Sequence, residues 1–516
     1  MGEIELVLGL LATVIVLTAL SRRLGASTPI VMVLGGLVLS LIPGVPQLEL
    51  PPDLVFFGFL PPLVFSGGFS TSIKDFRANL RPIVLLAFGL VLFTAALVAV
   101  VAHAFVPAIG WAGAFALGGI VAPPDEIAAL AIFQRLGVPR RIVTILEGES
   151  LVNDATALII YRFAVAAAAA GVFSLLDASL TFVIALVGGV AVGMVVGYAL
   201  DRLASRVSDT AIAVAITLVA PYAAYLPAES LGVSGILATV VAGLWVRHAQ
   251  RHGTSDTRVV GAAVWQIWLF MLNGLVFFLL GLQLPTVVRN VSLDATTLAA
   301  TTAVVLVVIF GRFLWVFPVT YVQRLLIPSL RRGTLAAPWR AVAVIGWSGL
   351  RGVVSLAAAL ALPDGFPARE LILLITFTVI LVTLVGQGLT LPAVIGLLGL
   401  VPEADRAGAD AHARALTAEA ALSRLEDLEA KWPTHKPLID SLRAKYEHAT
   451  SHAEETESTE PGAADQERVE HTQIRRELIE AERRAAFDLR ERGVIDDDVL
   501  RRLERDLDLE ELNTGA

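Results

Sequence analysis

Eight ionisable side chains stand inside apolar stretches of this chain that are long enough to cross a lipid bilayer. At membrane depth each of them costs about 2.5–3.5 kcal/mol even on the most lenient insertion scale. Five are acids that fall within thirty residues of one another, so their clustering predicts a site that handles ions. The eight are Asp125, Glu126, Glu147, Glu149, Asp154, Arg162, Arg312 and Arg351.

The richest stretch is the sixth apolar segment, which contains three of these acids. On a helix, Ser150 and Asp154 are four residues apart, and Glu147 lies one turn earlier on the same face. Glu149 and Asn153 form a second row turned about 100° away. Oxygen atoms of this kind are the ligands that hard cations such as sodium prefer. The alternative is that the acids only pair with arginines to stabilise the helix bundle, which is the favoured interpretation for Glu149 alone.

The fifth apolar segment is interrupted by Pro123 and Pro124 in its middle. A proline costs about 3 kcal/mol inside a helix. Unwound backbone at membrane depth is tolerated only where it is buried in protein or lines a cavity. Asp125 then either caps the following half-helix, 127–136, or contacts an ion directly. Glu126 is assigned no role.

The twelfth segment has a matching interruption, with Arg351 among Gly346, Gly349 and Gly352. Two interrupted helices in corresponding halves of an apolar chain indicate an inverted-repeat transporter and the place of its site. The fifth and twelfth spans are seven apart, so they cross the membrane in opposite directions. Spans 1–6 are therefore expected to repeat as spans 8–13 with crossed, unwound helices, and the seventh span is a connector.

The composition predicts an all-α polytopic membrane protein. Of 516 residues, 56% are apolar and only 17% are charged, against about 25% charged in an average soluble domain. Because a helix needs roughly 20 apolar residues to cross a bilayer, we predict thirteen transmembrane helices in a membrane domain, 1–401. The predicted spans are 4–21, 29–43, 54–70, 82–106, 109–134, 141–170, 176–200, 210–227, 232–247, 262–283, 295–322, 339–362 and 370–398.

The connecting loops predict the orientation of these spans. Taken alternately, one set of loops holds 17 basic residues, and the other holds only Arg289 and Arg369. Lysine and arginine accumulate on the cytoplasmic side, so the N-terminus is expected outside and the C-terminal tail inside. The basic pair Arg22 and Arg23 follows the first apolar stretch, which is the wrong order for a cleaved signal peptide.

The last part of the chain, 402–516, differs sharply in charge from the rest. It has 17 basic and 29 acidic residues, whereas 1–401 has 22 basic and 18 acidic ones. Apolar residues at helical spacing predict a cytoplasmic, acidic, helical tail. We expect helices over 412–430, 474–492 and 496–512, and a linker over 450–466. A small helical domain or self-association element is favoured over a regulatory role.

At this point the membrane part of the chain resembles the bacterial sodium/proton antiporters of the monovalent cation:proton antiporter family, which are related to animal sodium/proton exchangers. The pairing of the sixth-span motif with an arginine motif two hundred residues later is highly specific. The motifs are Phe59-Leu60-Pro61-Pro62-Leu63-Val64-Phe65, Glu149-Ser150-Leu151-Val152-Asn153-Asp154, Ser234-Gly235-Ile236-Leu237 with Ala242-Gly243, and Gly349-Leu350-Arg351-Gly352.

The resemblance implies a core domain that moves like an elevator against a separate dimerisation domain, in a homodimer. It also implies that Asp154 binds the ion, supported by Asn153, Ser150 and a backbone carbonyl near Pro124. Asp125 matches the aspartate of the family's broken helix.

Glu149 and Arg351 match family residues that pair with each other and maintain the shape of the site. The break itself departs from the family, which often has Thr-Asp-Pro where this chain has Pro123-Pro124-Asp125 followed by an acid. Members with an asparagine before the aspartate resemble electroneutral exchangers, so Asn153 favours one proton per cation.

These residues predict exchange of sodium or lithium for protons across the cytoplasmic membrane. A single carboxylate can hold either a proton or a cation, and burial favours its protonated form enough for protons to compete near neutral pH. The alternatives are potassium/proton exchange by the same site, and a channel or uniporter. No zinc-protease pair, nucleophile elbow or cofactor fingerprint indicates an enzyme. The expected partners are the two ions, the lipid bilayer and a second copy of the chain, with no cofactor and no nucleic acid.

Overall fold

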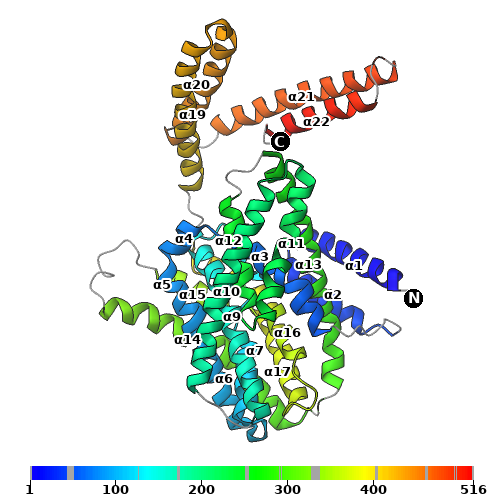
Figure 1. Ribbon diagram of the computed structural model, residues 1–516, viewed down its shortest axis with the longest axis vertical. Helices are drawn as coiled ribbons and strands as arrows, with labels where there is room; N and C mark the ends of the chain where they lie inside the picture. Colours follow the sequence, from blue (N-terminus) through cyan, green and yellow to red (C-terminus); the bar gives the residue numbers. More distant parts are fainter. Residues whose placement is uncertain are drawn as a thin grey trace. The chain divides into compact units, whose positions relative to one another are not determined.

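The computed structural model divides the chain into two compact units, Met1–Pro402 and Glu403–Ala516. We call them the membrane unit and the tail unit. Within the described residues every regular element is helical (Figure 1). The structure describes residues 3–43, 51–125, 127–170, 175–249, 255–289, 291, 293–326, 338–400, 405–458, 463–492, 494 and 497–513.

The first half of the membrane unit contains two α-helices that continue from π-helical segments. These segments are η1 and η2, which precede α3 and α6. The elements are α1 (Glu3–Leu24), α2 (Thr28–Ser40), η1 (Leu54–Phe59), α3 (Leu60–Ser70), α4 (Ile73–Ala78), α5 (Leu80–Val84), η2 (Leu85–Leu90), α6 (Val91–Phe105), η3 (Pro107–Ile109), α7 (Gly110–Val121), α8 (Ile127–Leu136) and α9 (Arg140–Ala170).

The second half contains four long helices, α10, α11, α13 and α14, and a pair of short half-helices, α15 and α16. Its elements are α10 (Leu175–Ala204), α11 (Thr210–Ser230), α12 (Gly235–Ala249), α13 (Ser255–Arg289), α14 (Ala295–Leu326), α15 (Trp339–Trp347), α16 (Val353–Leu360), α17 (Arg369–Leu381), η6 (Val382–Gln387) and α18 (Gly388–Leu397).

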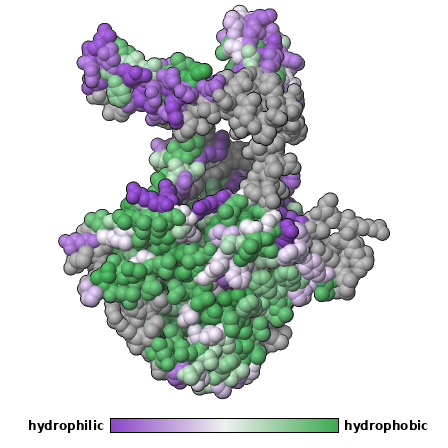
Figure 2. Space-filling model, turned by 180° about the vertical axis from the view of Figure 1, so that it is seen from behind, coloured by the Kyte–Doolittle hydropathy of each residue, from purple (hydrophilic) through white to green (hydrophobic). Residues whose placement is uncertain are grey.

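Helices occur in all thirteen segments predicted as spans. Within the described residues, seven helical stretches are long and apolar enough to cross a membrane by themselves, and the others are shorter or interrupted. The surface of the membrane unit is largely apolar (Figure 2). On α10, for example, the side chains of Leu180, Val183 and Val187 are 54–63% exposed. Such continuous apolar exposure indicates contact with lipid rather than with water.

The two interruptions fall where the prolines and glycines predict them. Helix α7 ends at Val121 and α8 begins at Ile127, and α15 ends at Trp347 and α16 begins at Val353. The segments between these half-helices contact each other, because the backbone N–H of Asp125 donates to the carbonyl of Leu350 at 2.7 Å. A hydrogen bond of this kind satisfies backbone groups that the helices no longer satisfy.

Close contact between α2 and α13 depends on glycine. A Cβ atom on Gly36 would overlap the carbonyl oxygen of Phe278, and one on Gly281 would overlap that of Val33. Small residues let two membrane helices approach until their backbones touch. This packing fixes the position of α13, which also forms one wall of the site described below.

The tail unit consists of two helical hairpins, each with its helices side by side (Figure 1). An ion pair of 2.6 Å between Arg443 and Glu429 joins the first hairpin, and Arg483 contacts Asp508 at 2.6 Å in the second. The hydrogen bond from Arg443 holds the pKa of Glu429 below its usual range. The helices are α19 (Asp405–Lys431), α20 (Lys436–Ser458), α21 (Ala463–Glu491) and α22 (Asp497–Asn513), with the short turn η7 (Pro433–His435).

The predicted tail linker over 450–466 is wrong for most of its length. Helix α20 continues to Ser458 and α21 begins at Ala463, so only 459–462 lie outside the described residues. Glutamate and alanine are good helix formers, and they extend both helices through a segment whose polarity favours a loop.

Candidate ion-binding site

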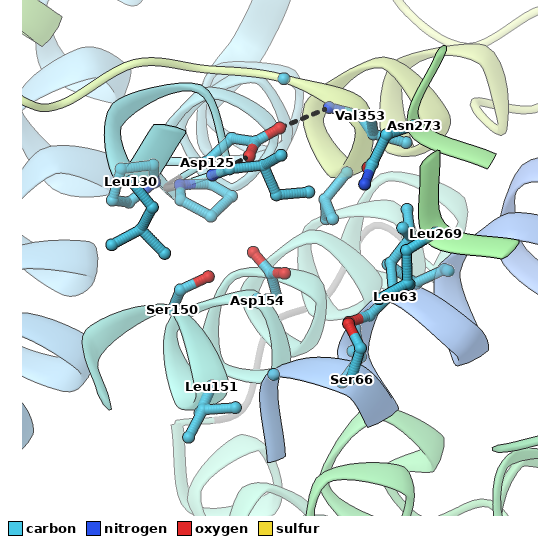
Figure 3. Close-up of a pocket in the computed structure, with 18 of the residues that line it drawn as sticks. Leu63, Ser66, Asp125, Leu130, Ser150, Leu151, Asp154, Leu269, Asn273 and Val353 are labelled. Carbon is cyan, nitrogen blue, oxygen red and sulfur yellow. Dashed lines mark hydrogen bonds between the residues drawn. The ribbon is translucent and has the colours of Figure 1, made fainter. Parts of the chain in front are cut away.

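A cavity of about 400 Å³ lies beside the interruption between α7 and α8. Ser150 and Asp154 line it from α9, Pro124 and Asp125 from the break, and Asn273 from α13 (Figure 3). Since a molecule of liquid water takes up about 30 Å³, the cavity has room for a cation with part of its hydration shell.

Asp154 is the carboxylate that faces this cavity without a balancing charge. Its side chain is 8% exposed, and among the described side chains no ion pair includes it. A buried carboxylate with no cationic neighbour is strongly disfavoured, so it gains most from binding either a proton or a cation. In Figure 3 its carboxyl group points into the cavity, near the hydroxyl of Ser150.

Asn153 is buried beside Asp154 but contacts the broken helix. Its amide nitrogen donates to the carbonyl oxygen of Pro124 at 3.0 Å, and Pro124 lines the cavity. The hydrogen bond fixes this carbonyl relative to α9. Asn153 therefore positions one potential oxygen ligand, while its own Oδ1 atom is buried and makes no hydrogen bond.

Asp125 links the two interrupted helices through its carboxylate. Its Oδ1 atom accepts from the N–H of Ile127 at 3.0 Å, and its Oδ2 atom accepts from the N–H of Val353 at 3.4 Å. These residues begin α8 and α16, so one negative charge faces the positive ends of two helix dipoles. Gly352 is required for this arrangement, because a Cβ atom there would overlap the Asp125 carboxylate. Of the two roles predicted for Asp125, the structure therefore contains the capping one.

Arg351 contacts the C-terminal end of the half-helix α7. Its side chain donates to the carbonyls of Val121 at 2.8 Å and Ala122 at 3.2 Å, and also to that of Gly349. Val121 is the last residue of α7, where unpaired carbonyls give the helix its negative end. The fully buried guanidinium of Arg351 thus compensates one half-helix terminus, as Asp125 compensates two others.

Glu149 pairs with Arg312 of α14 and not with Arg351, so the expected partner has to be corrected. Two parallel hydrogen bonds of 2.6 and 2.7 Å join the guanidinium to the carboxylate. Both side chains are 1% exposed, and Arg312 also donates to the carbonyl of Ile345 at 2.8 Å. The reason is geometric. Arg351 lies in the break, where the carbonyls of α7 use its donors, whereas Arg312 reaches Glu149 from a neighbouring continuous helix.

The structure adds two residues to the site that the sequence alone did not indicate, Asn273 of α13 and Ser355 of α16. Both line the cavity, but neither has a charge that would mark it as unusual in an apolar segment. Glu147, expected on the same face as Ser150 and Asp154, is not among the lining residues. Glu126 lies outside the described residues.

Comparison with known families agrees with this architecture. The family described as "Sodium/hydrogen exchanger, transmembrane" matches residues 9–396, which span the membrane unit and the whole site. The chain belongs to the sodium/hydrogen exchanger family.

Relatives of this exchanger occur in several bacteria. An uncharacterized Na(+)/H(+) exchanger of Mycobacterium tuberculosis is 33% identical over 534 residues, which cover 99% of this chain and 97% of the relative. The sodium, potassium, lithium and rubidium/H(+) antiporter of Bacillus subtilis is 35% identical over 420 residues, covering 76% of this chain and 61% of that protein.

The fold is shared with a solved structure. The sodium proton antiporter MjNhaP1 of Methanocaldococcus jannaschii at pH 8 matches with a TM-score of 0.57 and 17% identity, covering 77% of this chain and 100% of that one. The exchanger is thus a multi-pass membrane protein with an antiporter fold, all-helical within the residues that the structure describes.

Proposed function

We propose that this exchanger moves sodium or lithium out of the cell in return for protons, at Asp154, in the cytoplasmic membrane. The observation that carries the proposal is the difference between Asp154 and the other acids at the site. Glu149 has Arg312 as its partner and Asp125 has two helix ends. Asp154 faces the cavity with no such compensation, so its carboxylate is the group for which a proton and a cation compete.

Competition at one carboxylate is sufficient for exchange. If the protonated and the cation-loaded site can change sides and the empty anion cannot, each cation that leaves requires a proton to enter. The empty anion is held back because a lone charge cannot cross a low-dielectric interface without a large desolvation cost. Asn153 adds no second negative charge, which supports one proton per cation and thus an electroneutral cycle.

We further infer alternating access by an elevator-type movement of a core domain, within a homodimer. The two broken helices that contact each other through Asp125 support an inverted-repeat core with crossed, unwound helices in a chain of thirteen spans. The cavity reaches Ser150 and Gln134, toward the end of α9 that the loop charges predict to be cytoplasmic. We therefore infer that the cavity opens inward.

An ion pair on the other side of Asp154 supports closure toward the outside. Arg162 lies two turns beyond Asp154 on α9, about 12 Å along the helix. Its guanidinium contacts Glu229 at 2.6 Å, and Glu229 also accepts from the N–H of Gly235, the first residue of α12, at 3.1 Å. If α9 moves relative to α11 and α12, this contact has to open.

Arg162→Gln is therefore expected to shift the exchanger away from its inward-open state. The pair is partly exposed, 51% at Arg162 and 18% at Glu229, so its contribution is below about 1 kcal/mol, or up to about fivefold in populations. Because the chain contains no cysteine, Gln134→Cys would give a single label site in the cavity. Its labelling from the cytoplasmic side should slow by up to this factor in the Arg162→Gln variant.

The control for this experiment is Arg140→Gln, at the other end of α9. Among the described residues, the ion pair of Arg140 is a 3.9 Å contact with Asp75, with side chains 75% and 41% exposed. Its removal should leave the labelling rate unchanged. Equal labelling rates with and without Arg162 would contradict a closing role for the ion pair.

Potassium is the second candidate substrate. Relatives in Bacillus subtilis and Bacillus pumilus have names that include sodium, potassium, lithium and rubidium, whereas the one in Aphanothece halophytica is named a Na(+)/H(+) antiporter. The site itself favours hard cations through its carboxylate, hydroxyl and carbonyl oxygens.

The proposed function is tested with purified exchanger in liposomes that contain a pH dye. Outside sodium or lithium should move protons in a saturable way, and the apparent affinity for the cation should weaken at low pH. An equal or stronger response to potassium would replace sodium with the second candidate. An imposed membrane voltage should leave the rate unchanged, and a voltage-dependent rate would contradict electroneutrality.

A further inference from the structure

Two polar side chains from outside the predicted site line the cavity with unpaired oxygen atoms. The Oδ1 atom of Asn273 and the Oγ atom of Ser355 are both buried, and neither makes a hydrogen bond within the described protein. Buried polar atoms almost always have a partner, because an unsatisfied one costs about 1–3 kcal/mol. Both atoms are on residues that line the same cavity as Asp154, which indicates that they have a partner when the site is loaded.

These side chains add to the oxygen atoms that line the cavity. Ser150 and Asp154 come from α9, Ser355 lies in the first turn of α16, and Asn273 faces them from α13. In Figure 3 the amide of Asn273 extends toward the cavity across from Asp154. A cation that leaves water needs several replacement oxygen ligands, and one carboxylate supplies only part of them.

We propose that Asn273 supplies a neutral oxygen ligand to the cation held at Asp154, with Ser355 as a second one. This inference rests on the proposed function, which it deepens. A proton bound to Asp154 needs no such ligands, whereas a partly dehydrated cation does. Asn273 therefore sets the affinity for the cation relative to the proton and does not itself titrate.

This division of roles has a kinetic signature. When a proton and a cation compete for one site, low pH raises the half-saturating cation concentration by a factor that is set by the proton concentration and the proton affinity of the site. Loss of a ligand that serves the cation alone should multiply the half-saturating concentration by the same factor at every pH. A variant that instead changed proton affinity would give a factor that varies with pH.

The experiment compares Asn273→Ala with Leu269→Ala in the liposome assay. Leu269 lies one turn earlier on α13 and lines the same cavity with an apolar side chain, so it controls for loss of volume. Asn273→Ala should raise the half-saturating sodium concentration roughly tenfold or more, equally across the pH range, and the maximal rate should be retained. Leu269→Ala should change it much less.

The outcomes separate this inference from the proposed function. If the wild-type protein moves no protons in response to a cation, the proposed function itself fails. If the wild-type exchanges and Asn273→Ala has the same half-saturating concentration as Leu269→Ala, the ligand role is overturned while the function stands. A factor that varies with pH also overturns it. Should Asn273→Ala not fold, Asn273→Leu keeps a similar side-chain volume and removes the oxygen ligand. An unchanged sodium affinity in that variant would equally overturn the proposal.

Discussion

Asp154→Asn is expected to abolish cation-driven proton movement and to leave the exchanger folded. The substitution keeps the shape of the side chain but removes the charge that holds a cation and the group that accepts a proton. Because no cationic side chain among the described residues pairs with Asp154, its neutralisation should not destabilise the bundle, and the thermal midpoint in detergent should equal or exceed that of the wild type. The measurement is proton flux in dye-loaded liposomes, and protein-free liposomes give the background flux.

Asp364→Asn provides the matched control. Asp364 is fully exposed in the turn before α17, and among the described side chains it has a single ion pair, a 3.9 Å contact with Arg369. The same chemical change there should leave the flux at the wild-type rate. Wild-type flux in the Asp154→Asn variant would remove Asp154 from the centre of the mechanism.

The second large effect is expected at the buried pair of Glu149 and Arg312. Glu149→Gln or Arg312→Ala leaves one fully buried charge without its partner, which costs about 3–5 kcal/mol. Both variants should therefore show a lower thermal midpoint and a lower yield of folded protein. The double variant Glu149→Gln with Arg312→Ala should cost less than the sum of the two single replacements, since no lone charge then remains.

Arg351 serves as the comparison for the double-mutant cycle of Glu149 and Arg312. It was the expected partner of Glu149, yet its side chain donates to carbonyl oxygens at Val121 and Ala122. Arg351→Ala should also destabilise the fold, because the carbonyl groups at the C-terminal end of α7 then lose their hydrogen-bond donor. The coupling free energy between Arg351→Ala and Glu149→Gln should be smaller than that between Arg312→Ala and Glu149→Gln. A larger coupling to Arg351 would mean that the pairing in the structure is not the one that stabilises the protein.

Local sequence determines much of this fold. Pro123 and Pro124 cannot continue a helix, and three glycines weaken the one around Arg351, so the two interruptions follow from the residues themselves. The helical spacing of Ser150 and Asp154 also predicts that both face one cavity, as they do. Features that depend on one helix at a time can be predicted from the chain.

Features that depend on how helices meet could not be predicted in the same way. Arg312 and Arg351 are equally anomalous in the sequence, and only the tertiary arrangement decides that Arg312 of α14 is the one that reaches Glu149. Asn273 has no charge and sits in an ordinary apolar segment, so nothing local marks it. Its buried, unpaired oxygen becomes significant only when α13 is placed across from Asp154.

Proton release on cation binding tests the central claim most directly, because it requires no transport. Purified exchanger is placed in weakly buffered detergent solution with a pH indicator, at a pH where the site is protonated, and sodium is added. If a cation and a proton compete for Asp154, the wild type should release up to about one proton per chain, and Asp154→Asn should release none. Absence of release from the wild type, or equal release from Asp154→Asn, would contradict the claim.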